Sequence, residues 1–318
     1  MHTTEPNLKT ADSRYHLPVL LCESVDGLQI EPSGTYVDMT FGGGGHSIEM
    51  LKRLNSKGRV IAFDQDADAQ KNAAAVGDKR LTLVQSNFRF FHNHLHRLGI
   101  AQVNGVLGDL GVSWHQFDSA QRGFSFRFDA PLDMRMNQQS ALTASDIVNN
   151  YAVENLTRIF TLYGELDKAY SIAKMIVQAR NTAPLNTIND LLNALKNVLP
   201  KFDEHKYLAK IFQALRIEVN GEMRALEQAL QHCTKSITAG GRMVMITYHS
   251  LEDRIVKNFI KTGNAAGEAK KDMFGATKVP FAAVNKKVIL PAEQEIASNS
   301  RARSAKLRIA ERQWIIEN

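Results

Sequence analysis

The feature that most constrains the fold of this chain is a run of four glycines, Gly42 to Gly45, between a strand-like and a helix-like segment. An apolar pair, Tyr36-Val37, and a carboxylate, Asp38, come before the run, and a helical apolar pattern follows it. Glycine has no Cβ, so the backbone can adopt positive φ and approach a ligand closely. The following helix offers unpaired N–H groups at its start. This strand, turn and helix predict a nucleotide-type cofactor site at the edge of a sheet.

Two common glycine-rich sites do not fit this run. The NAD or FAD fingerprint requires a third glycine where this chain has Ser47 or Ile48, depending on the register. A P-loop requires a lysine just after its last glycine, and the first lysine here is Lys52. S-adenosylmethionine has no phosphates and therefore needs neither feature. It carries a cationic sulfonium, an amino-acid tail, a ribose diol and an adenine, which makes it the cofactor that fits best.

Carboxylates at strand ends support this interpretation. Asp38 is a candidate contact for the amino group, and Asp64, 19 residues after Gly45, can accept both ribose hydroxyls. Phe88 begins a helix and can pack against adenine, and Asp109 ends the strand where the methyl group would be presented. Each residue has a plainer alternative: a loop glycine, an Asp that caps a helix or forms a turn, a Phe in the core. Three strands that each end in Asp, at regular spacing, favour the site.

The order of elements predicts an α/β fold with a parallel sheet and a helical insertion, because strand and helix patterns alternate on both sides of a long helical block. We expect strands at 35–38, 59–64, 81–84, 103–109 and 243–248, and helices at 47–55, 66–75, from 88 to about 98, and 222–235. Other expected features are a turn at 239–241 and helix caps at 187–190 and at Ser250 with Asp253. The expected organisation is a flexible tail at 1–14, a discontinuous α/β domain at 15–115 and 217–318, and an inserted loop and helical domain at 116–216 that recognises substrate.

Composition narrows the setting of the protein. The chain has 318 residues and a formal net charge of +6, and residues 250–318 contain 13 Lys or Arg but only 8 Asp or Glu. That asymmetry favours an anionic partner such as nucleic acid, with a solvated basic surface as the alternative. Two cysteines without metal-ligand spacing predict a reducing compartment and no metal. The polar N-terminus and the lack of an apolar run of ~18 residues predict a cytoplasmic protein without membrane segments.

Several longer motifs resemble one known family, the ribosomal RNA small-subunit methyltransferase H family, over nearly the whole chain. They lie in the same order, from residue 16 to about 312. The matching segments are His16 to Glu23, Thr40 to Ser47, Gly108 to Ser113, Arg122 to Phe126, Pro131 to Met136, Phe212 to Ile217, His249 to Arg254 and Arg301 to Arg308.

The resemblance implies a class I S-adenosylmethionine-dependent methyltransferase fold, Rossmann-like and mostly parallel, with an inserted all-helical domain. It also implies methylation of N4 of a decoding-centre cytidine in 16S rRNA of the small ribosomal subunit. Carried over residue by residue, the implied cofactor contacts are Gly44, Gly45, His46, Asp64, Phe88, Asp109 and Gln116. The chain departs from the family pattern at Gly108, Trp114 and Ser300, and the first two put the shape of the methyl-transfer pocket in doubt.

The residues also favour chemistry at an exocyclic amine. Methylation at cytosine C5 usually needs a cysteine nucleophile, and neither Cys22 nor Cys233 lies at a strand end with the cofactor residues. An amine needs orientation and hydrogen-bond acceptors instead. Asp109 and His249 are the catalytic candidates, although a helix cap near His249 is an alternative. The Asp/Asn-Pro-Pro-Tyr/Phe motif of many amine methyltransferases is missing, since Asp109-Leu110-Gly111-Val112 stands there.

A base that is methylated in such a pocket must first be unstacked. Arg122, Phe124 and Arg127 interleave charge with aromatic rings, as expected for RNA contacts, or else they form a self-packed loop. A second basic set for phosphate contacts, some of which could make internal ion pairs, is Arg301, Arg303, Lys306 and Arg308. Other classes remain open: a non-catalytic RNA-binding or ribosome assembly factor, or a methyltransferase for a DNA or protein amine. The sequence does not decide the oligomeric state, and a homodimer is one option.

Overall fold

The computed structural model describes residues 18–113, 116–117, 119–269 and 279–314, so the expected tail and Trp114 lie outside the described residues. The chain divides into two compact units. Unit 1 consists of residues 1–111 and 225–318, and unit 2 of residues 112–224. Unit 2 therefore takes the place of the expected insertion, with its ends at 112 and 224 rather than at 116 and 216. Among the helices of the described ranges, none combines the length and hydropathy that crossing a membrane requires.

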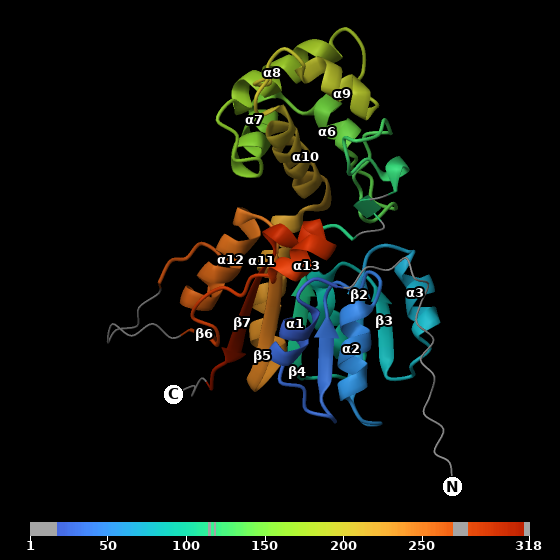
Figure 1. Ribbon diagram of the computed structural model, residues 1–318, viewed down its shortest axis with the longest axis vertical. Coiled ribbons are helices and arrows are strands. Elements are labelled where there is room, and N and C mark those ends of the chain that lie inside the picture. Colours follow the sequence, from blue (N-terminus) through green and yellow to red (C-terminus); the bar gives the residue numbers. More distant parts are fainter. Residues whose placement is uncertain (1–17, 114–115, 118, 270–278, 315–318) are drawn as a thin grey trace. The chain divides into compact units, whose positions relative to one another are not determined.

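Unit 1 is built on a seven-stranded sheet in the order β3-β2-β1-β4-β5-β7-β6 (Figure 1). The first five strands in that order pair in parallel, while β7 runs antiparallel to β5 and β6. The strands are β1 (Thr35–Asp38), β2 (Arg59–Asp64), β3 (Leu81–Gln85), β4 (Val103–Asp109), β5 (Ile237–Thr247), β6 (Phe281–Ala283) and β7 (Lys306–Arg312). The mostly parallel α/β fold that the sequence predicts is confirmed.

Helices cover both faces of this sheet because successive strand residues point to opposite sides. Tyr36 and Val60 pack with α1 and α2 on one face, while Val37 and Ile61 pack with α4, α11 and α12 on the other. The helices of unit 1 are α1 (Leu21–Gly27), α2 (Gly45–Arg53), α3 (Ala69–Val76), α4 (Phe91–Arg97), α12 (Ser250–Thr262) and α13 (Glu293–Ser298), with 3-10 turns η1 (Phe88–Phe90) and η3 (Ser300–Ser304). Helix α11 (Glu222–Ser236) leads the chain from unit 2 back into unit 1.

Three sequence expectations were wrong in detail. The turn expected at 239–241 lies inside β5, where Gly240 has a φ of 79° and the register with β4 shifts, so the strand continues through an irregularity. Strands β6 and β7 were missed. The signal that reveals β7 is alternation: Leu307 and Ile309 are buried, and Lys306 and Arg308, each just before one of them, are more exposed. The helix expected from residue 88 begins as the 3-10 turn η1.

Unit 2 is helical and has its own core. Its helices are α6 (Ala144–Asn150), α7 (Val153–Leu162), α8 (Ala169–Arg180), α9 (Ile188–Leu195) and α10 (Glu204–Asn220), after a 3-10 turn η2 (Ala120–Arg122). Capping boxes fix two helix starts, Thr143 with Asp146 at α6 and Thr187 with Asp190 at α9. The helix start predicted at 187–190 is confirmed.

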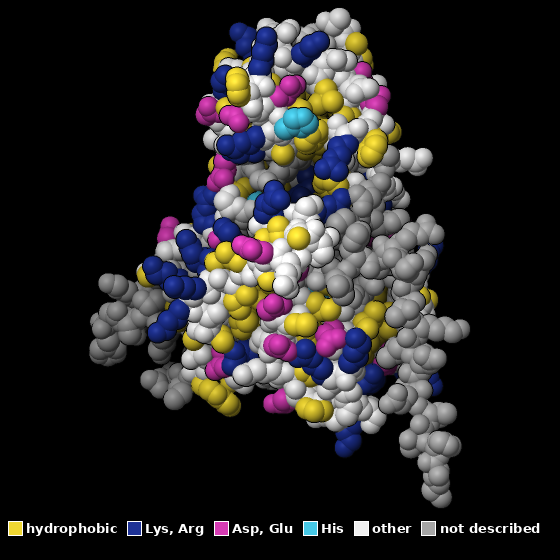
Figure 2. Space-filling model, in the orientation of Figure 1, with side chains coloured by type: hydrophobic (Ala, Val, Ile, Leu, Met, Phe, Trp, Pro, Cys, Tyr) yellow, Lys and Arg dark blue, Asp and Glu magenta, His cyan; other side chains and the backbone are white. Residues whose placement is uncertain are grey.

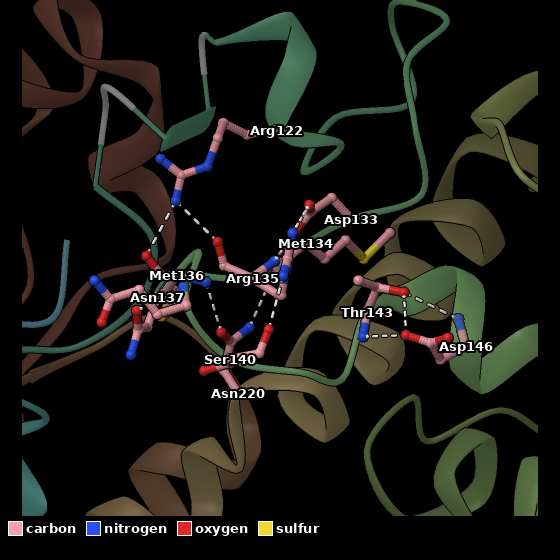
Figure 3. Close-up of polar contacts among 11 residues, drawn as sticks. Arg122, Asp133, Met134, Arg135, Met136, Asn137, Ser140, Thr143, Asp146 and Asn220 are labelled. Carbon is pink, nitrogen blue, oxygen red and sulfur yellow. Dashed lines mark hydrogen bonds and ion pairs between the residues drawn. The ribbon is translucent and has the colours of Figure 1, made fainter. Parts of the chain in front are cut away.

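The loop before α6 is held to α10 and η2 by hydrogen bonds to its backbone (Figure 3). Arg122 donates to the carbonyl oxygens of Arg135 at 2.8 Å and Met136 at 3.0 Å. Asn220 of α10 accepts from the N–H of Met136 at 2.7 Å and donates to the carbonyl of Met134 at 2.8 Å. Met134 has a φ of 59°, a strained value for a side chain of this size. These bonds stabilise a backbone that would otherwise relax.

Candidate functional site

Asp38, at the end of β1, anchors the glycine loop that joins β1 to α2. Asp38 is fully buried, and its two carboxylate oxygens accept from the Ser47 hydroxyl at 2.7 Å and the Thr40 N–H at 3.0 Å. Burial raises the pKa of Asp38 to about 6, the bonds from Ser47 and Thr40 lower it, and the charge of Asp64 raises it. Asp38 thus joins both ends of the loop, and both its oxygens are engaged by the protein.

Glycine is required at two positions of the loop. Gly44 is the N-cap of α2 with a φ of 83°, and a Cβ there would lie 2.8 Å from the ring of Phe41. A Cβ on Gly45 would lie 2.1 Å from Cγ of Pro18. Without side chains at these positions, the backbone at the start of α2 can approach a ligand closely.

His46, an implied cofactor contact, turns its ring into the protein. Only 5% of the residue is exposed, and Nε2 lies 3.3 Å from the carbonyl oxygen of Val19. Burial lowers the pKa of His46 to about 4, and the bond to Val19 raises it. The imidazole is therefore neutral near pH 7, and the group of His46 suited to a ligand is its backbone N–H in the first turn of α2.

Asp64 connects the end of β2 to the same loop. Its Oδ2 accepts from the Gly42 N–H and its Oδ1 from the Asp66 N–H, each at 2.8 Å. Asn72 donates to the carbonyl oxygen of Gly42 at 2.9 Å. Burial raises the pKa of Asp64 above its ordinary value, with smaller opposing contributions from the hydrogen bonds of Asp66 and Gly42. Each carboxylate oxygen has a second lone pair, so Asp64 can still accept from a ligand.

Asp109, at the end of β4, is hydrogen-bonded to both Thr40 and Tyr248. Its N–H donates to the Thr40 hydroxyl at 2.7 Å, and its Oδ1 accepts from the Tyr248 hydroxyl at 2.7 Å. Burial raises the pKa of Asp109 to about 7, the Tyr248 bond lowers it, and the charges of Asp38 and Glu252 raise it. Asp109 therefore titrates near neutral pH.

The three strand-end carboxylates share one electrostatic property. Within the described residues, no Lys, Arg or His forms an ion pair with Asp38, Asp64 or Asp109. Strand β1 lies between β2 and β4, so the three side chains gather at the carboxyl edge of the sheet. Buried carboxylates without cations are costly in the ionised form. This edge is therefore suited to a ligand that brings positive charge.

The other implied cofactor residues lie in different settings. Phe88 starts η1 after β3 and packs, half-buried, against the core that contains Phe63 and Phe91. Gln116 belongs to unit 2, where it is 4% exposed and its N–H donates to the Ser113 hydroxyl at 3.3 Å.

The structure explains one departure from the family pattern. A Cβ on Gly108 would lie 2.9 Å from Sδ of Met245 and 3.5 Å from Sδ of Met39. The two flanking methionines thus fill the space that a larger residue at position 108 would take. Glycine at position 108 therefore serves packing inside the sheet.

In unit 2, two of the three residues expected to bind RNA are interior. Arg122 and Phe124 are each 6% exposed; Phe124 belongs to the core of the unit, and Arg122 holds backbone carbonyl groups as described above (Figure 3). We therefore correct both to structural residues, in line with the alternative of a self-packed loop. Arg127 is exposed.

The C-terminal basic set divides in a similar way. Arg308 makes a two-point ion pair with Asp253, at 2.7 and 3.2 Å, and Lys306 lies 3.6 Å from the same carboxylate. Arg308 therefore attaches α12 to β7, and we correct it to a structural residue. The side chain of Lys306 is 40% exposed, so its RNA contact stays a prediction. Arg303 is exposed in η3, and Arg301 is half-buried beside it.

His249 is the N-cap of α12. Its Nδ1 accepts from the Glu252 N–H at 3.4 Å, and Glu252 in turn accepts from the N–H groups of Tyr248 at 2.8 Å and His249 at 3.4 Å. The expectation that Ser250 and Asp253 cap this helix was wrong, because the capping pair lies one residue earlier. The cap role uses Nδ1 alone, and the catalytic role of His249 stays a prediction.

Sequence reasoning missed Tyr248 and Glu252 as members of this edge. Tyr248 follows the last residue of β5, and a parallel strand brings its carboxyl end to the same edge as Asp109. The rule that selected Asp38, Asp64 and Asp109 would have found Tyr248 if it had been applied to any polar residue at a strand end.

Comparison with known proteins agrees with this geometry. The sequence profile of the MraW methylase family matches residues 13–313. Ribosomal RNA small subunit methyltransferase H of Bacteroides fragilis (strain YCH46) is 54% identical over 305 residues, which cover 96% of this chain and all of that protein. The proteins of the same name from Parabacteroides distasonis and Flavobacterium johnsoniae are 55% and 52% identical, covering 96% and 95% of this chain and 100% and 99% of their own.

The raised pKa of Asp109 predicts that the free energy of unfolding of the ligand-free protein depends on pH. The native state retains a proton up to about pH 7, whereas an unfolded Asp loses it near pH 3.9. The free energy of unfolding of the wild type therefore falls as pH rises from about 4 to 7 and levels off above 7. Asp109→Asn keeps an acceptor for Tyr248 and has no charge to bury. The variant should gain about 2–3 kcal/mol over wild type between pH 5 and pH 8, measured by urea unfolding. A stability difference that is constant over this range would contradict the assignment.

Proposed function

The chain belongs to the MraW methylase family, and from this premise we propose that it transfers a methyl group from S-adenosylmethionine to ribosomal RNA of the small subunit. The finer proposal is methylation of N4 of a decoding-centre cytidine in 16S rRNA. The names of the relatives support the RNA substrate, and the motifs at Gly108 to Ser113 and His249 to Arg254 support the finer assignment by resemblance. The observation that carries the proposal is the group of three buried carboxylates without a cation at the carboxyl edge of the sheet.

The residues at this edge fit S-adenosylmethionine. The cofactor, when bound, supplies a methyl group on a positively charged sulfur. Gly44 and Gly45 let the loop pack against Phe41 and Pro18, and the first N–H groups of α2 remain as donors for a ligand. No phosphate has to be held, in keeping with a loop that has no lysine before Lys52. We propose that the cofactor is held in unit 1 by Gly44, Gly45, His46 through its backbone, Asp64, Phe88 and Asp109. Gln116, which the resemblance also implies, belongs to unit 2 and stays a prediction.

We propose that Asp109 takes part in the chemistry of the amine. Methylation of an exocyclic amine by a sulfonium donor would form a bond from nitrogen to the methyl carbon, break the methyl–sulfur bond to leave a neutral thioether, and release one proton from the nitrogen. Asp109 is the group suited to accept that proton, because it ends β4 at the carboxyl edge of the sheet and a cation bound beside it would keep its carboxylate ionised before transfer. Tyr248 fixes the carboxylate through Oδ1 at 2.7 Å and so acts as a positioning residue.

The cysteines support an amine target over a ring carbon. Cys233 is buried in α11, and burial raises the pKa of its thiol far above the ordinary value, so a thiolate is disfavoured there. Cys22 is exposed in α1 rather than at a strand end. Neither thiol fits the nucleophile that C5 methylation requires.

An Asp64→Ala variant tests the cofactor role separately from RNA binding. We expect S-adenosylmethionine affinity to fall by about 10- to 100-fold, since a hydrogen bond to a charged group contributes about 1.5–3 kcal/mol. RNA affinity should persist. Calorimetry measures the affinity for the cofactor, and filter binding measures the affinity for RNA. Asp26→Ala on α1, which removes a carboxylate whose side chain is 66% exposed, is the control. Equal loss of both affinities in Asp64→Ala would contradict the role.

Nucleoside analysis tests the proposed reaction. Purified protein is incubated with labelled S-adenosylmethionine and small subunits that lack this modification, and the RNA is then digested. The proposal predicts label in N4-methylcytidine at one site of 16S rRNA. Label in C5-methylcytidine, in another nucleoside or in protein would refute the finer assignment. Cofactor binding without any transfer would favour a non-catalytic RNA-binding or assembly factor.

A further inference from the structure

Helix α12 carries a row of exposed cations that no role so far accounts for. Arg254, Lys257 and Lys261 are exposed and follow one another by three and four residues, so they share one side of the helix. We call these three residues the basic stripe. Figure 2 shows Lys and Arg side chains gathered where α12 lies in Figure 1. At a rise of about 1.5 Å per residue, the stripe extends over about 10 Å of the helix axis.

The two acidic residues of α12 are used inside unit 1. Glu252 is 2% exposed and accepts from the N–H of Tyr248 at 2.8 Å. Asp253 stands four residues before Lys257, the spacing of an intrahelical ion pair, but it binds Arg308 at 2.7 Å and Lys306 at 3.6 Å instead. The strand β7 thus takes the carboxylate that would otherwise neutralise Lys257.

Helices α2 and α3 pair cations within the protein. On α2, Lys52 lies 3.0 Å from Glu49, and Arg53 forms an ion pair with Asp26. On α3, Lys71 lies 3.1 Å from Asp68. On α12, Lys257 and Lys261 stand four residues apart, and like charges at that spacing destabilise a helix. An anionic partner would compensate this local repulsion.

The position of α12 in the chain connects the stripe to the candidate site. The helix starts one residue after His249 and two after Tyr248, whose hydroxyl donates to Asp109. The stripe therefore lies on the element that leads directly away from the site edge. An anion bound along it would belong to a long ligand whose other part reaches that edge.

We propose that the basic stripe binds consecutive phosphates of the substrate RNA. The inference rests on the proposed function, because RNA is the polyanion that this function supplies. It assigns to Lys257 and Lys261, with Arg254, the phosphate contacts that the sequence pattern suggested for Arg308. Arg308 instead holds the inner side of α12 on β7 and so keeps the stripe turned outward.

The test is the salt dependence of RNA binding by the full-length chain. Each phosphate contact contributes about 0.7 to 0.9 to the slope of log affinity against log salt concentration. Lys257→Gln with Lys261→Gln should lower the slope by about 1.4 to 1.8 for a fragment of 16S rRNA. Cofactor affinity and kcat at saturating RNA should stay within twofold of wild type, and KM for RNA should rise. The thermal midpoint should not fall, since like charges are removed.

A charge-matched control separates a local contact from net charge. Lys52→Gln with Lys71→Gln removes two exposed positive charges from α2 and α3 and should leave the slope nearly unchanged. The inference is overturned if both double variants change the slope equally, or if neither does. It is also overturned if the α12 variant weakens binding to intact subunits but not to naked RNA, which would identify a protein partner. Methyl transfer by the wild-type protein in the same assay tests the proposed function independently.

Discussion

The arrangement of unit 1 depends on carboxylates that are buried where parallel strands end. Asp38, Asp64 and Asp109 occupy the ends of β1, β2 and β4, and each holds backbone or side-chain donors that shape the loops above the sheet. Their burial is unfavourable when they are ionised, and nothing cationic in the described chain compensates it. The carboxylates that organise the loops are thus also the groups that a cationic ligand would stabilise in the ionised form. This connects the fold to its proposed cofactor.

Charge is handled differently elsewhere in the protein. Asp253 is paired with Arg308 and Lys306, and that pairing joins α12 to the antiparallel strand β7. One consequence is structural: β7 extends the sheet beyond the parallel strand β5, and the ion pair attaches α12 to β7. The other consequence is electrostatic, because the outward side of α12 is left positive. Anions are therefore favoured on α12, and cations at the strand ends.

The sequence predicted the parallel strands well, because their apolar runs alternate with helical patterns and three of them end in Asp. It failed where residues serve packing rather than ligands. Arg122 and Phe124 carry the charge and rings expected of an RNA contact, yet local backbone bonds and the core of unit 2 take them inward. Tyr248 was missed because the strand-end rule was applied to carboxylates alone, and its bond to Asp109 is a contact between two strand ends far apart in the sequence. These roles depend on tertiary contacts, which the spacing of residues in the sequence does not reveal.

The central claim is that this edge of the sheet binds a cation and that Asp109 ionises to receive it. Calorimetry at pH 6 and pH 8 with S-adenosylmethionine and with its neutral thioether product tests this most directly. Because the pKa of Asp109 is about 7, affinity for the cationic form should rise about tenfold between these pH values, with proton release on binding. Affinity for the neutral form should stay level or fall. Equal pH dependence for the two ligands would contradict the account.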